Sequence, residues 1–530
     1  MIKRKTGLLA AVATLVGLTA CTEWDDHYDN TVVEGSNTTL WQQVAERPEL
    51  SDFAEVLTNT KVFRQHKKSP VSYAELLNGG QSLTVFAPVN GTFNKDSLIA
   101  LTQTAQGDSA VEMFFVKNHL AGKLHSAADT TAKFRMLNGK YVSIQRDNVS
   151  GIPFGDNNLR SKNGIMHIVQ QQVPYTFTIY EALTQKEEYA AIGNVLKKYN
   201  EDYFDENASL SSGLVDGIPV YVDSVVYEIN KLMNAVGQLN DEDSTYYVTL
   251  PTTAGWQAAW ETALSYYKYS ADVEKADSLQ HYWTSRALLE DAIFSKTIQR
   301  NMEDSVKTYR YDKEYPMYHV FHRPFDNEGI FGKAKGMNKC SNGYIYYHDE
   351  WPFTPTQTYF RKIEQEAEYT WNIPTYTTDR CNIITRYLNA DSISRGGYLD
   401  IVGLKDKWEV TYKLSNTLAG NYDFNIVVLP KTVEGPNGNK RPCKFKATIN
   451  YIDEDGKAKT YNCGGKAFTT NPNKVDTIMV AKNFRLPVCN YDRDNEKISI
   501  TITCDVNAKE ATRYNREMYL DCIFLRPNDK

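Results

Sequence analysis

The chain has 530 residues, more than a single domain normally holds, so its length predicts two to four domains. Hydrophobic residues make up 42% and charged residues 23%, which is the composition of an ordinary globular protein and excludes a disordered chain. The net charge of −6 is spread without a basic stripe, which argues against nucleic acid as a partner.

The first 20 residues are typical of an export signal. Residues 3–5 are basic, and the apolar run over 6–18 is too short to span a bilayer as a mature helix. Residues 18–21, Leu-Thr-Ala-Cys, resemble a bacterial lipobox. The resemblance implies removal of residues 1–20 and a lipid on Cys21; a plain secretory signal with a chance cysteine is the alternative.

Residues 21–37 are polar and predict a flexible tether. Acidic residues directly after Cys21, in Glu23-Trp24-Asp25-Asp26, resemble the signal that sends some Gram-negative lipoproteins to the cell surface. We therefore expect an outer-membrane protein that is anchored by lipid and faces the cell exterior.

Seven further cysteines follow, without a C-x-x-C pair and without closely spaced histidines, so a zinc site is not expected. An exported chain could form disulfides, but the spacing does not determine the pairing. They are Cys340, Cys381, Cys443, Cys463, Cys489, Cys504 and Cys522.

The first folded part opens with short helices and a buried strand. Apolar residues at helical spacing over 41–57 are interrupted by Pro48, which predicts two short helices. A third short helix, 73–77, ends at Gly79-Gly80. The run Leu83-Thr84-Val85-Phe86-Ala87-Pro88 then predicts a buried strand that stops at the proline.

Three ordered blocks resemble the fasciclin (FAS1) domain. The first is the strand with Phe86 and Pro88, the second is a segment with His119, and the third is the closing Asn-Gly-x-x-His block over 163–167. We assign residues 38–176 to this domain. The resemblance implies that Phe86, Pro88, His119, Asn163, Gly164 and His167 have structural roles, that the opening strand packs beside the closing strand, and that no cofactor is bound. A strand pair with a turn at Asn138-Gly139 is expected between them.

Residues 177–366 predict a second, divergent copy. A helical stretch over 178–198, a strand that stops at Pro251, a helix over 279–294 and an Asn-Gly block at 342–343 follow in the same order. The copy departs from the family at Tyr347, where a histidine is usual, and in a long insertion over 203–222.

Residues 367–530 change character and predict an antiparallel β-sandwich, because helical periodicity gives way to short alternating runs separated by polar turns. The ending over 519–527 resembles the last strand of galactose-binding-like jelly rolls. The fold class is therefore multidomain, two α+β FAS1 domains followed by an all-β domain. The expected strands are 398–402, 408–414, 422–429, 445–452, 475–480, 498–504 and 518–525.

Catalytic and metal motifs are absent from the sequence, which contains no G-x-S-x-G, no H-E-x-x-H, no phosphate loop and no dinucleotide fingerprint. His319 and His322 would point to opposite faces of a strand, which disfavours joint metal binding. Residues 453–455 could hold calcium, but a solvated turn explains them more simply. We expect no catalytic residues, no metal and no cofactor.

Aromatic residues are the remaining candidates for ligand binding, because sugar rings stack on flat aromatic faces. The candidates are Trp351, Trp408, Tyr412 and Tyr422; alternation places Trp408 and Tyr412 on one face, and core packing is the competing role for most of the four.

Two functions remain open. In the first, the chain is a non-enzymatic accessory subunit of an outer-membrane SusC/SusD-type nutrient uptake complex and contacts a glycan or the porin. In the second, it is an adhesin whose FAS1 domains bind host or matrix components.

Overall fold

The computed structural model describes residues 37–64, 67–215, 218–296, 305–307, 320–322, 329–435, 440–493 and 497–528. The predicted signal, Cys21 and His319 lie outside these residues. The chain divides into two compact units, Met1–Tyr247 with Met337–Ile345 and Val248–Gly336 with Tyr346–Lys530. In the described part, no helix has the length and apolar character needed to cross a membrane.

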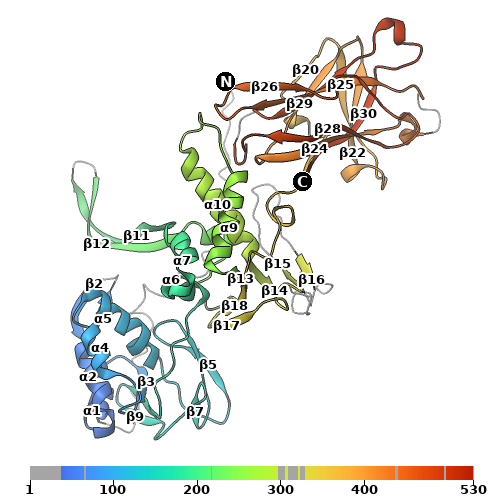
Figure 1. Ribbon diagram of the computed structural model, residues 1–530. Helices are drawn as coiled ribbons and strands as arrows, with labels where there is room; N and C mark the ends of the chain where they lie inside the picture. Colours follow the sequence, from blue (N-terminus) through green and yellow to red (C-terminus); the bar gives the residue numbers. More distant parts are fainter. Residues whose placement is uncertain are drawn as a thin grey trace, which may run out of the picture. The chain divides into compact units, whose positions relative to one another are not determined.

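Short helices open the first unit, and the sequence determines where they begin and end (Figure 1). The Thr39 side chain accepts from the Gln42 N–H and the Gln42 side chain accepts from the Thr39 N–H, a capping box that starts the first helix. Pro48 starts the turn that separates the first two helices, as predicted. The elements are α1 (Leu40–Ala45), η1 (Pro48–Leu50), α2 (Ser51–Asn59), β1 (Lys61–Arg64), β2 (Lys67–Ser72), α3 (Tyr73–Asn78), α4 (Lys95–Leu101), α5 (Ala105–Val111), η2 (Glu112–Val116) and η3 (Lys117–His119).

The predicted opening and closing strands lie side by side at the centre of a four-stranded sheet with the order β4-β3-β10-β9. β3 (Leu83–Pro88) pairs in parallel with β10 (Gly164–Val169), and Phe86 lies opposite His167. Every residue of both strands is buried, as the continuous apolar run predicts. The outer strands are β4 (Leu120–Gly122) and β9 (Leu159–Ser161).

The two faces of β3 serve two cores, because successive side chains of a strand point to opposite faces. Val85 and Ala87 pack with the helices. Phe86 points the other way, where its ring stacks on Phe134 at 6.0 Å between centroids. Phe134 belongs to a second sheet with the order β5-β6-β7-β8, and Gly139, at φ 83°, makes the predicted hairpin turn. The strands are β5 (Ala132–Arg135), β6 (Tyr141–Ile144), β7 (Asn148–Val149) and β8 (Ile152–Pro153).

Asn163 and Gly164 join the closing strand to the first helices. The Asn163 amide donates to Leu77 O at 2.9 Å and Gly79 O at 2.7 Å, and its oxygen accepts from the Leu40 N–H at 2.9 Å. A Cβ on Gly164 would lie 2.2 Å from Leu83 O, so a larger residue does not fit without movement of the backbone. These contacts explain why this block of the sequence requires Asn-Gly.

The second segment, residues 177–366, follows the predicted order of elements. One six-stranded sheet has the order β16-β15-β14-β13-β18-β17. The predicted insertion is a long ribbon of two strands, β11 (Asn200–Val215) and β12 (Ile218–Asn230). The other elements are α6 (Ile179–Gln185), η4 (Glu187–Tyr189), α7 (Ala190–Lys197), α8 (Met233–Val236), β13 (Tyr246–Pro251), α9 (Thr253–Tyr266), α10 (Ala276–Ala292), β14 (Ile293–Lys296), β15 (Ser305–Lys307), β16 (Val320–His322), β17 (Gly336–Cys340), β18 (Gly343–His348) and η6 (Pro355–Gln357).

Asn342 repeats the hydrogen bonds of Asn163. Its oxygen accepts from the Ile179 N–H at 2.8 Å, and its amide donates to Leu239 O at 2.8 Å and Asp241 O at 3.0 Å. Gly343 follows it at φ +145°, and a Cβ there would lie 1.9 Å from Tyr246 O. The same pair of residues therefore ties a closing strand to an opening helix twice in this chain.

A lysine joins residues 38–176, the first module, to the second segment within the first unit. Lys140 leaves the β5–β6 hairpin, is 6% exposed, and places its Nζ 2.6 Å from Glu181 Oε2 and 2.7 Å from Glu242 Oε1. Ser341 Oγ lies 3.3 Å from the same Nζ. Nearby, Asp243 accepts a hydrogen bond from the Tyr141 hydroxyl at 2.7 Å.

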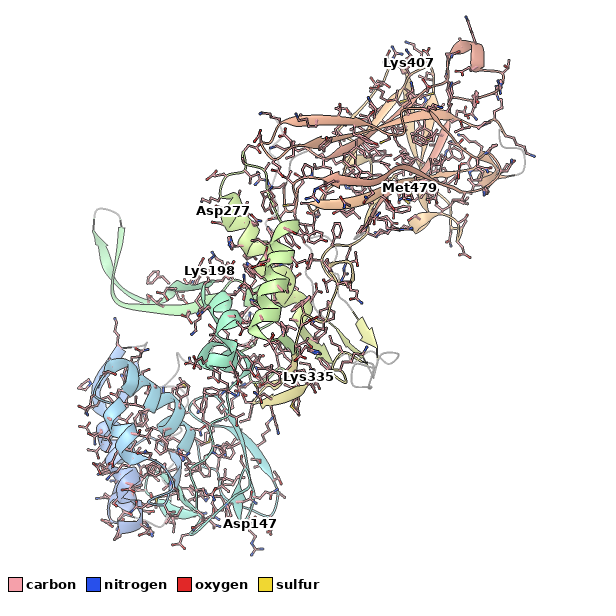
Figure 2. The ribbon with its side chains drawn as sticks, in the orientation of Figure 1. Asp147, Lys198, Asp277, Lys335, Lys407 and Met479 are labelled. Carbon is pink, nitrogen blue, oxygen red and sulfur yellow. The ribbon has the colours of Figure 1, made fainter. Side chains whose placement is uncertain are left out.

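Residues from Ile363 onward form the predicted antiparallel sandwich. One sheet has the order β21-β22-β30-β24-β28 with β19 on β30, and the other has the order β20-β23-β29-β25-β26 with β27 on β25. On the first of these sheets, the Met479 side chain of β28, labelled in Figure 2, is 44% exposed. The strands are β19 (Ile363–Glu366), β20 (Thr375–Tyr376), β21 (Cys381–Tyr387), β22 (Gly397–Gly403), β23 (Glu409–Lys413), β24 (Gly420–Leu429), β25 (Lys444–Ile452), β26 (Ala458–Asn462), β27 (Phe468–Thr469), β28 (Asp476–Leu486), β29 (Ser499–Cys504) and β30 (Met518–Pro527).

The expected border at residue 366 differs from the structure. β19 pairs with β30 over Ile363↔Leu525 to Glu366↔Cys522, so the sandwich begins before the predicted border. The acidic triplet at 453–455 forms the turn between β25 and β26, where Asp453 Oδ1 accepts from the Lys457 N–H at 2.9 Å. The turn predicted for these residues is therefore present.

Candidate functional site

His119 is a buried structural residue. Its exposure is 0%, its Nδ1 lies 2.8 Å from Phe115 O, and its Nε2 accepts from the Val173 N–H at 2.9 Å. Burial lowers the pKa of His119 from 6.5 to about 4, so the ring is neutral at neutral pH. Both ring nitrogens contact backbone groups inside the core.

His167 has the same character on the closing strand. It is 0% exposed, its Nε2 lies 2.9 Å from His125 O, and its Nδ1 accepts from the Asn158 N–H at 3.3 Å. Burial lowers its pKa from 6.5 to about 4. The ring stacks between Phe86, at 5.2 Å, and Phe154, at 5.0 Å, and so helps to fill the second core.

A hollow of about 540 Å³ opens beside Phe154 in the first module. Its polar groups bond to one another: Arg146 pairs with Asp129 at 3.2 Å, and the Asn158 amide oxygen accepts from the Ala127 N–H at 2.8 Å. We assign no ligand to it.

The predicted role in ligand binding is wrong for three of the four aromatic residues, because their side chains are buried. Trp408, Tyr412 and Tyr422 are 0%, 0% and 1% exposed. Trp408 Nε1 donates to Arg516 O at 2.7 Å, and the Tyr412 hydroxyl donates to Ala367 O at 3.0 Å. The predicted shared face of Trp408 and Tyr412 exists, but it is the inner face of the sandwich, where no sugar ring can reach.

Trp351, the fourth, is half-buried in an aromatic cluster. Its ring meets Trp256 edge-on at 6.1 Å and Phe353 at 5.6 Å. Its indole nitrogen has no hydrogen-bond partner among the described residues. Its assignment to ligand binding stays a prediction.

The sandwich presents a different aromatic pair to solvent. Trp371 is 67% exposed, and its ring stacks on Tyr369 with the centroids 4.6 Å apart and the planes inclined by 17°. A tryptophan is rarely so exposed, because burying its large apolar surface is favourable. The stacked pair therefore offers a flat apolar platform to a ligand.

The platform is held in place by short-range contacts. Trp371 lies in η7 (Thr370–Asn372), directly after β19, and the Asn372 N–H donates to Tyr369 O at 3.0 Å. The Asn372 amide also donates to Gln365 Oε1 at 2.9 Å, which ties the turn to β19. On the other side, Arg395 pairs with Glu366 at 3.1 Å. A hydrogen bond with the Tyr369 side chain is the main cause that raises the pKa of the Arg395 guanidinium.

Sequence analysis missed this pair because it lies beside the predicted border at residue 366, outside every expected strand. One signal was available. Tyr369 and Trp371 stand in a short polar connection with no helical or strand period, so neither residue has a predicted core to fill.

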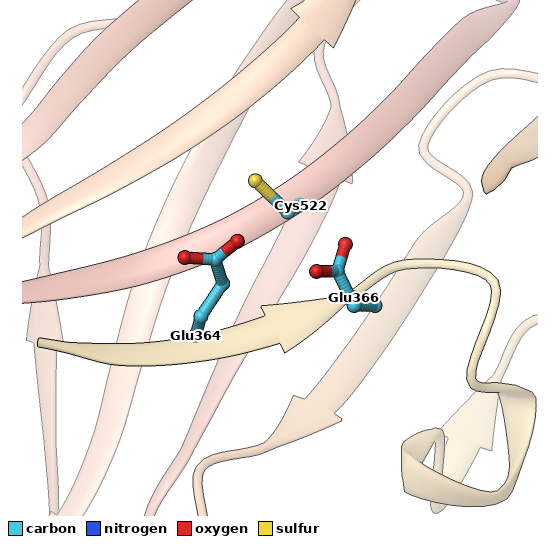
Figure 3. Close-up of side chains that lie close together, drawn as sticks. All are labelled: Glu364, Glu366 and Cys522. Atoms are coloured by element: carbon cyan, nitrogen blue, oxygen red, sulfur yellow. The ribbon is translucent and has the colours of Figure 1, made fainter. Parts of the chain in front are cut away.

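An acidic cluster lies on the paired strands β19 and β30 (Figure 3). Ligand atoms of Glu364, Glu366 and Cys522 all lie within 4.8 Å of one another. Glu368 and Asp521, both buried, add two more carboxylates. Among the described residues, Oε2 of Glu366 and Oε2 of Glu368 have no hydrogen-bond partner.

The cluster changes the protonation of its members. Burial is the main cause that raises the pKa of Glu366 to about 7 and that of Asp521 to about 6, and neighbouring carboxylates act in the same direction. Burial also raises the pKa of the Cys522 thiol, which therefore stays protonated and is a poor metal ligand. Chemically, the cluster can keep a proton on Glu366 near neutral pH or use its carboxylate oxygens for one hard cation.

The comparisons with known proteins locate one family in the chain. The model of the fasciclin domain matches residues 49–173. These residues form a fasciclin domain. The match covers the strands β3 and β10 and both buried histidines. No curated protein sequence matches the chain.

Solved structures match at low similarity. The carbohydrate-binding module and catalytic module of Clostridium thermocellum endo-1,4-beta-D-xylanase 10B, complexed with xylohexaose, has a TM-score of 0.23 and 10% identity; the match covers 31% of this chain and 28% of that one, less than two thirds of its length. The C-terminal family 22 carbohydrate-binding module of the same enzyme has a TM-score of 0.21 and 11% identity, covering 31% and 93%. The xylan-binding domain of a Paenibacillus barcinonensis enzyme has a TM-score of 0.22 and 10% identity, covering 31% and 92%.

Proposed function

We propose that the protein is a non-enzymatic binding protein whose sandwich holds a glycan at the Tyr369–Trp371 platform. The observation that carries this proposal is the 67% exposure of Trp371 on a stacked partner. A sugar ring laid on Trp371 buries apolar C–H surface against the indole, while its hydroxyl groups can bond to neighbouring polar side chains. Arg395 and Asn372 are the polar residues tied to this turn.

A glycan array followed by calorimetry on a bound glycan tests this proposal. We expect Trp371→Ala to weaken binding at least tenfold and Trp371→Phe to weaken it less, because phenylalanine keeps a smaller flat face. Tyr387→Ala is the matched control, since Tyr387 is 76% exposed on β21 and outside the platform's turn. Unchanged binding by Trp371→Ala would exclude the platform, and cleavage of the glycan would exclude a purely binding role.

The second segment is, in this proposal, a divergent second fasciclin domain. The support is the repeated Asn-Gly geometry: Asn342 makes the three hydrogen bonds that Asn163 makes, and Gly343 approaches the opening strand as Gly164 does. With Asn342 and Gly343 aligned on Asn163 and Gly164, the residue in the place of His167 is Tyr346, so the departure from the family lies there and not at Tyr347 as predicted.

We further propose that the chain is a lipoprotein of the outer membrane, anchored through Cys21 and exposed to the exterior, and that it is an accessory subunit of a SusC/SusD-type uptake complex. The lipobox-like residues 18–21 and the acidic residues that follow support this placement. Mass spectrometry of the mature chain should find an acylated Cys21, and mild-detergent purification should recover a porin with it. The alternative, an adhesin, predicts cell or matrix binding that survives deletion of residues 363–530.

A further inference from the structure

The insertion in the second segment carries an unusual charge. Residues 200–230, the stretch of sequence that includes β11 and β12, contain seven acidic residues and no Lys, Arg or His. The whole chain has a net charge of −6, so the remaining residues carry a net charge of +1. The acidity of the protein is therefore concentrated in this ribbon. The seven are Glu201, Asp202, Asp205, Glu206, Asp216, Asp223 and Glu228.

The ribbon pairs only with itself in the described part of the chain. β11 and β12 form a separate two-stranded sheet, from Asn200↔Asn230 at the base to Val215↔Ile218 near the tip, and Figure 1 shows them side by side. Among the strands that the structure describes, none pairs with either outer edge, and two strands alone are at best marginally stable in water. Such an extended element gains stability when something covers it.

One cross-strand pair of like charges destabilises the ribbon. Asp202 lies directly opposite Glu228, and both side chains are exposed. Like charges at directly opposed positions repel, since their Cβ atoms are only about 4.5–5.5 Å apart. A cationic group placed over the pair would turn this repulsion into attraction. On the same face, two residues along β11, Phe204 is 39% exposed and provides apolar contact area, whereas Tyr203, 54% exposed, lies on the opposite face.

We propose that the β11–β12 ribbon is a docking surface for a partner protein with a basic, Lys- and Arg-bearing face. Basic side chains over Asp202 and Glu228 relieve the like-charge pair, and Phe204 on the same face adds apolar contact. Glu201 is already paired with Lys231 at 2.6 Å, so the attractive positions lie further along the ribbon. The interaction depends on charge and should weaken with salt.

The test compares three full-length mature proteins: the natural chain, Asp202→Asn with Glu228→Gln, and a control, Glu274→Gln with Asp391→Asn. The control removes the same charge from exposed positions outside the ribbon. The probe is a fluorescent octalysine peptide, whose binding is followed by anisotropy at low and at physiological salt. Thermal melts and sedimentation are recorded for all three proteins.

We expect the ribbon variant to bind octalysine at least fivefold more weakly than the natural chain, and the control to bind like the natural chain. The ribbon variant should melt at the same or a higher temperature, because it has lost a repulsive pair, so weaker binding cannot be attributed to unfolding. Equal binding by the two variants overturns the proposal. A dimer of the natural chain that the ribbon variant loses also overturns it, since the occupant would then be a second copy of this chain.

Discussion

The Nζ of Lys140 lies 2.7 Å from Oε1 of Glu242, across the junction between the first module and the second segment. The same ammonium group pairs with Glu181. The Glu181 carboxylate also accepts a hydrogen bond from the N–H of Thr178, the N-cap residue of α6. One side chain from a hairpin of the first module therefore neutralises carboxylates that belong to the next segment. The junction is a specific, nearly buried ion cluster, which a flexible linker would not require.

Lys140→Met should destabilise the first unit by about 3 kcal/mol, because it leaves two carboxylates facing each other at low exposure. Thermal melts followed by circular dichroism measure the loss. Adding Glu242→Gln to the variant removes one stranded charge and should restore part of the stability. If the Lys140→Met variant alone melts like the natural protein, the role assigned to Lys140 is contradicted.

Asn163→Ala and Asn342→Ala should be equally harmful, each costing about 2–4 kcal/mol, since each removes two buried and one part-buried hydrogen bond to the backbone. Hydrogen exchange read by mass spectrometry can assign each loss to its own segment. Asn234→Ala, at an exposed position on α8, is the control and should have little effect. Clearly unequal effects at 163 and 342 would argue against the repeated architecture.

Glu366 should make the sandwich less stable as pH rises. Its pKa is near 7 in the folded protein and 4.5 ordinarily, so the folded state holds a proton that the unfolded chain releases between these values. The contribution of protonated Glu366 to the free energy of unfolding is complete below pH 4.5 and is lost as the pH rises to 7 and above. Glu366→Gln cannot titrate and should flatten melting temperature against pH over 5 to 8; the effect is on the order of 2 kcal/mol.

The buried histidines should act in the opposite direction in the first module. The pKa values of His119 and His167 fall from 6.5 to about 4, so the unfolded chain binds protons there before the folded chain does. Stability should therefore fall as pH decreases from 6.5 to 4. Hydrogen exchange of residues 38–176, corrected for the intrinsic rate at each pH, measures this loss. His119→Gln should show a smaller acid effect; an unchanged one would exclude His119 as a cause.

The fasciclin part of the fold could be predicted because its signals are local. Pro48 begins a helical turn and Pro88 ends a strand. The apolar run that ends at Ala87 is buried on both faces, so a continuous run of apolar residues was enough to predict this strand. In the sandwich, alternation found the long central strands. It missed β19, whose residues Ile363–Glu366 contain three polar side chains and become a strand only by pairing with β30.

The candidate site was harder to predict. Alternation correctly placed Trp408 and Tyr412 on one face, but it cannot say which face is covered by the opposite sheet. Exposure of Trp371 depends on η7 leaving the sheet after β19, and the lack of a helical or strand period around it is the one local sign of this. The acidic cluster likewise requires two strands that are about 160 residues apart in sequence to lie side by side, and such pairing is a property of topology.

The last strand, β30, lies between β22 and β24 and also carries β19. During synthesis, its neighbours are therefore made well before the strand on which they assemble. A ribosome that stops before Met518 releases a chain in which three strands lack their shared partner. This sheet can therefore be completed only after residue 527 has been translated. Chains that end before β30 should be cleaved more readily by proteases.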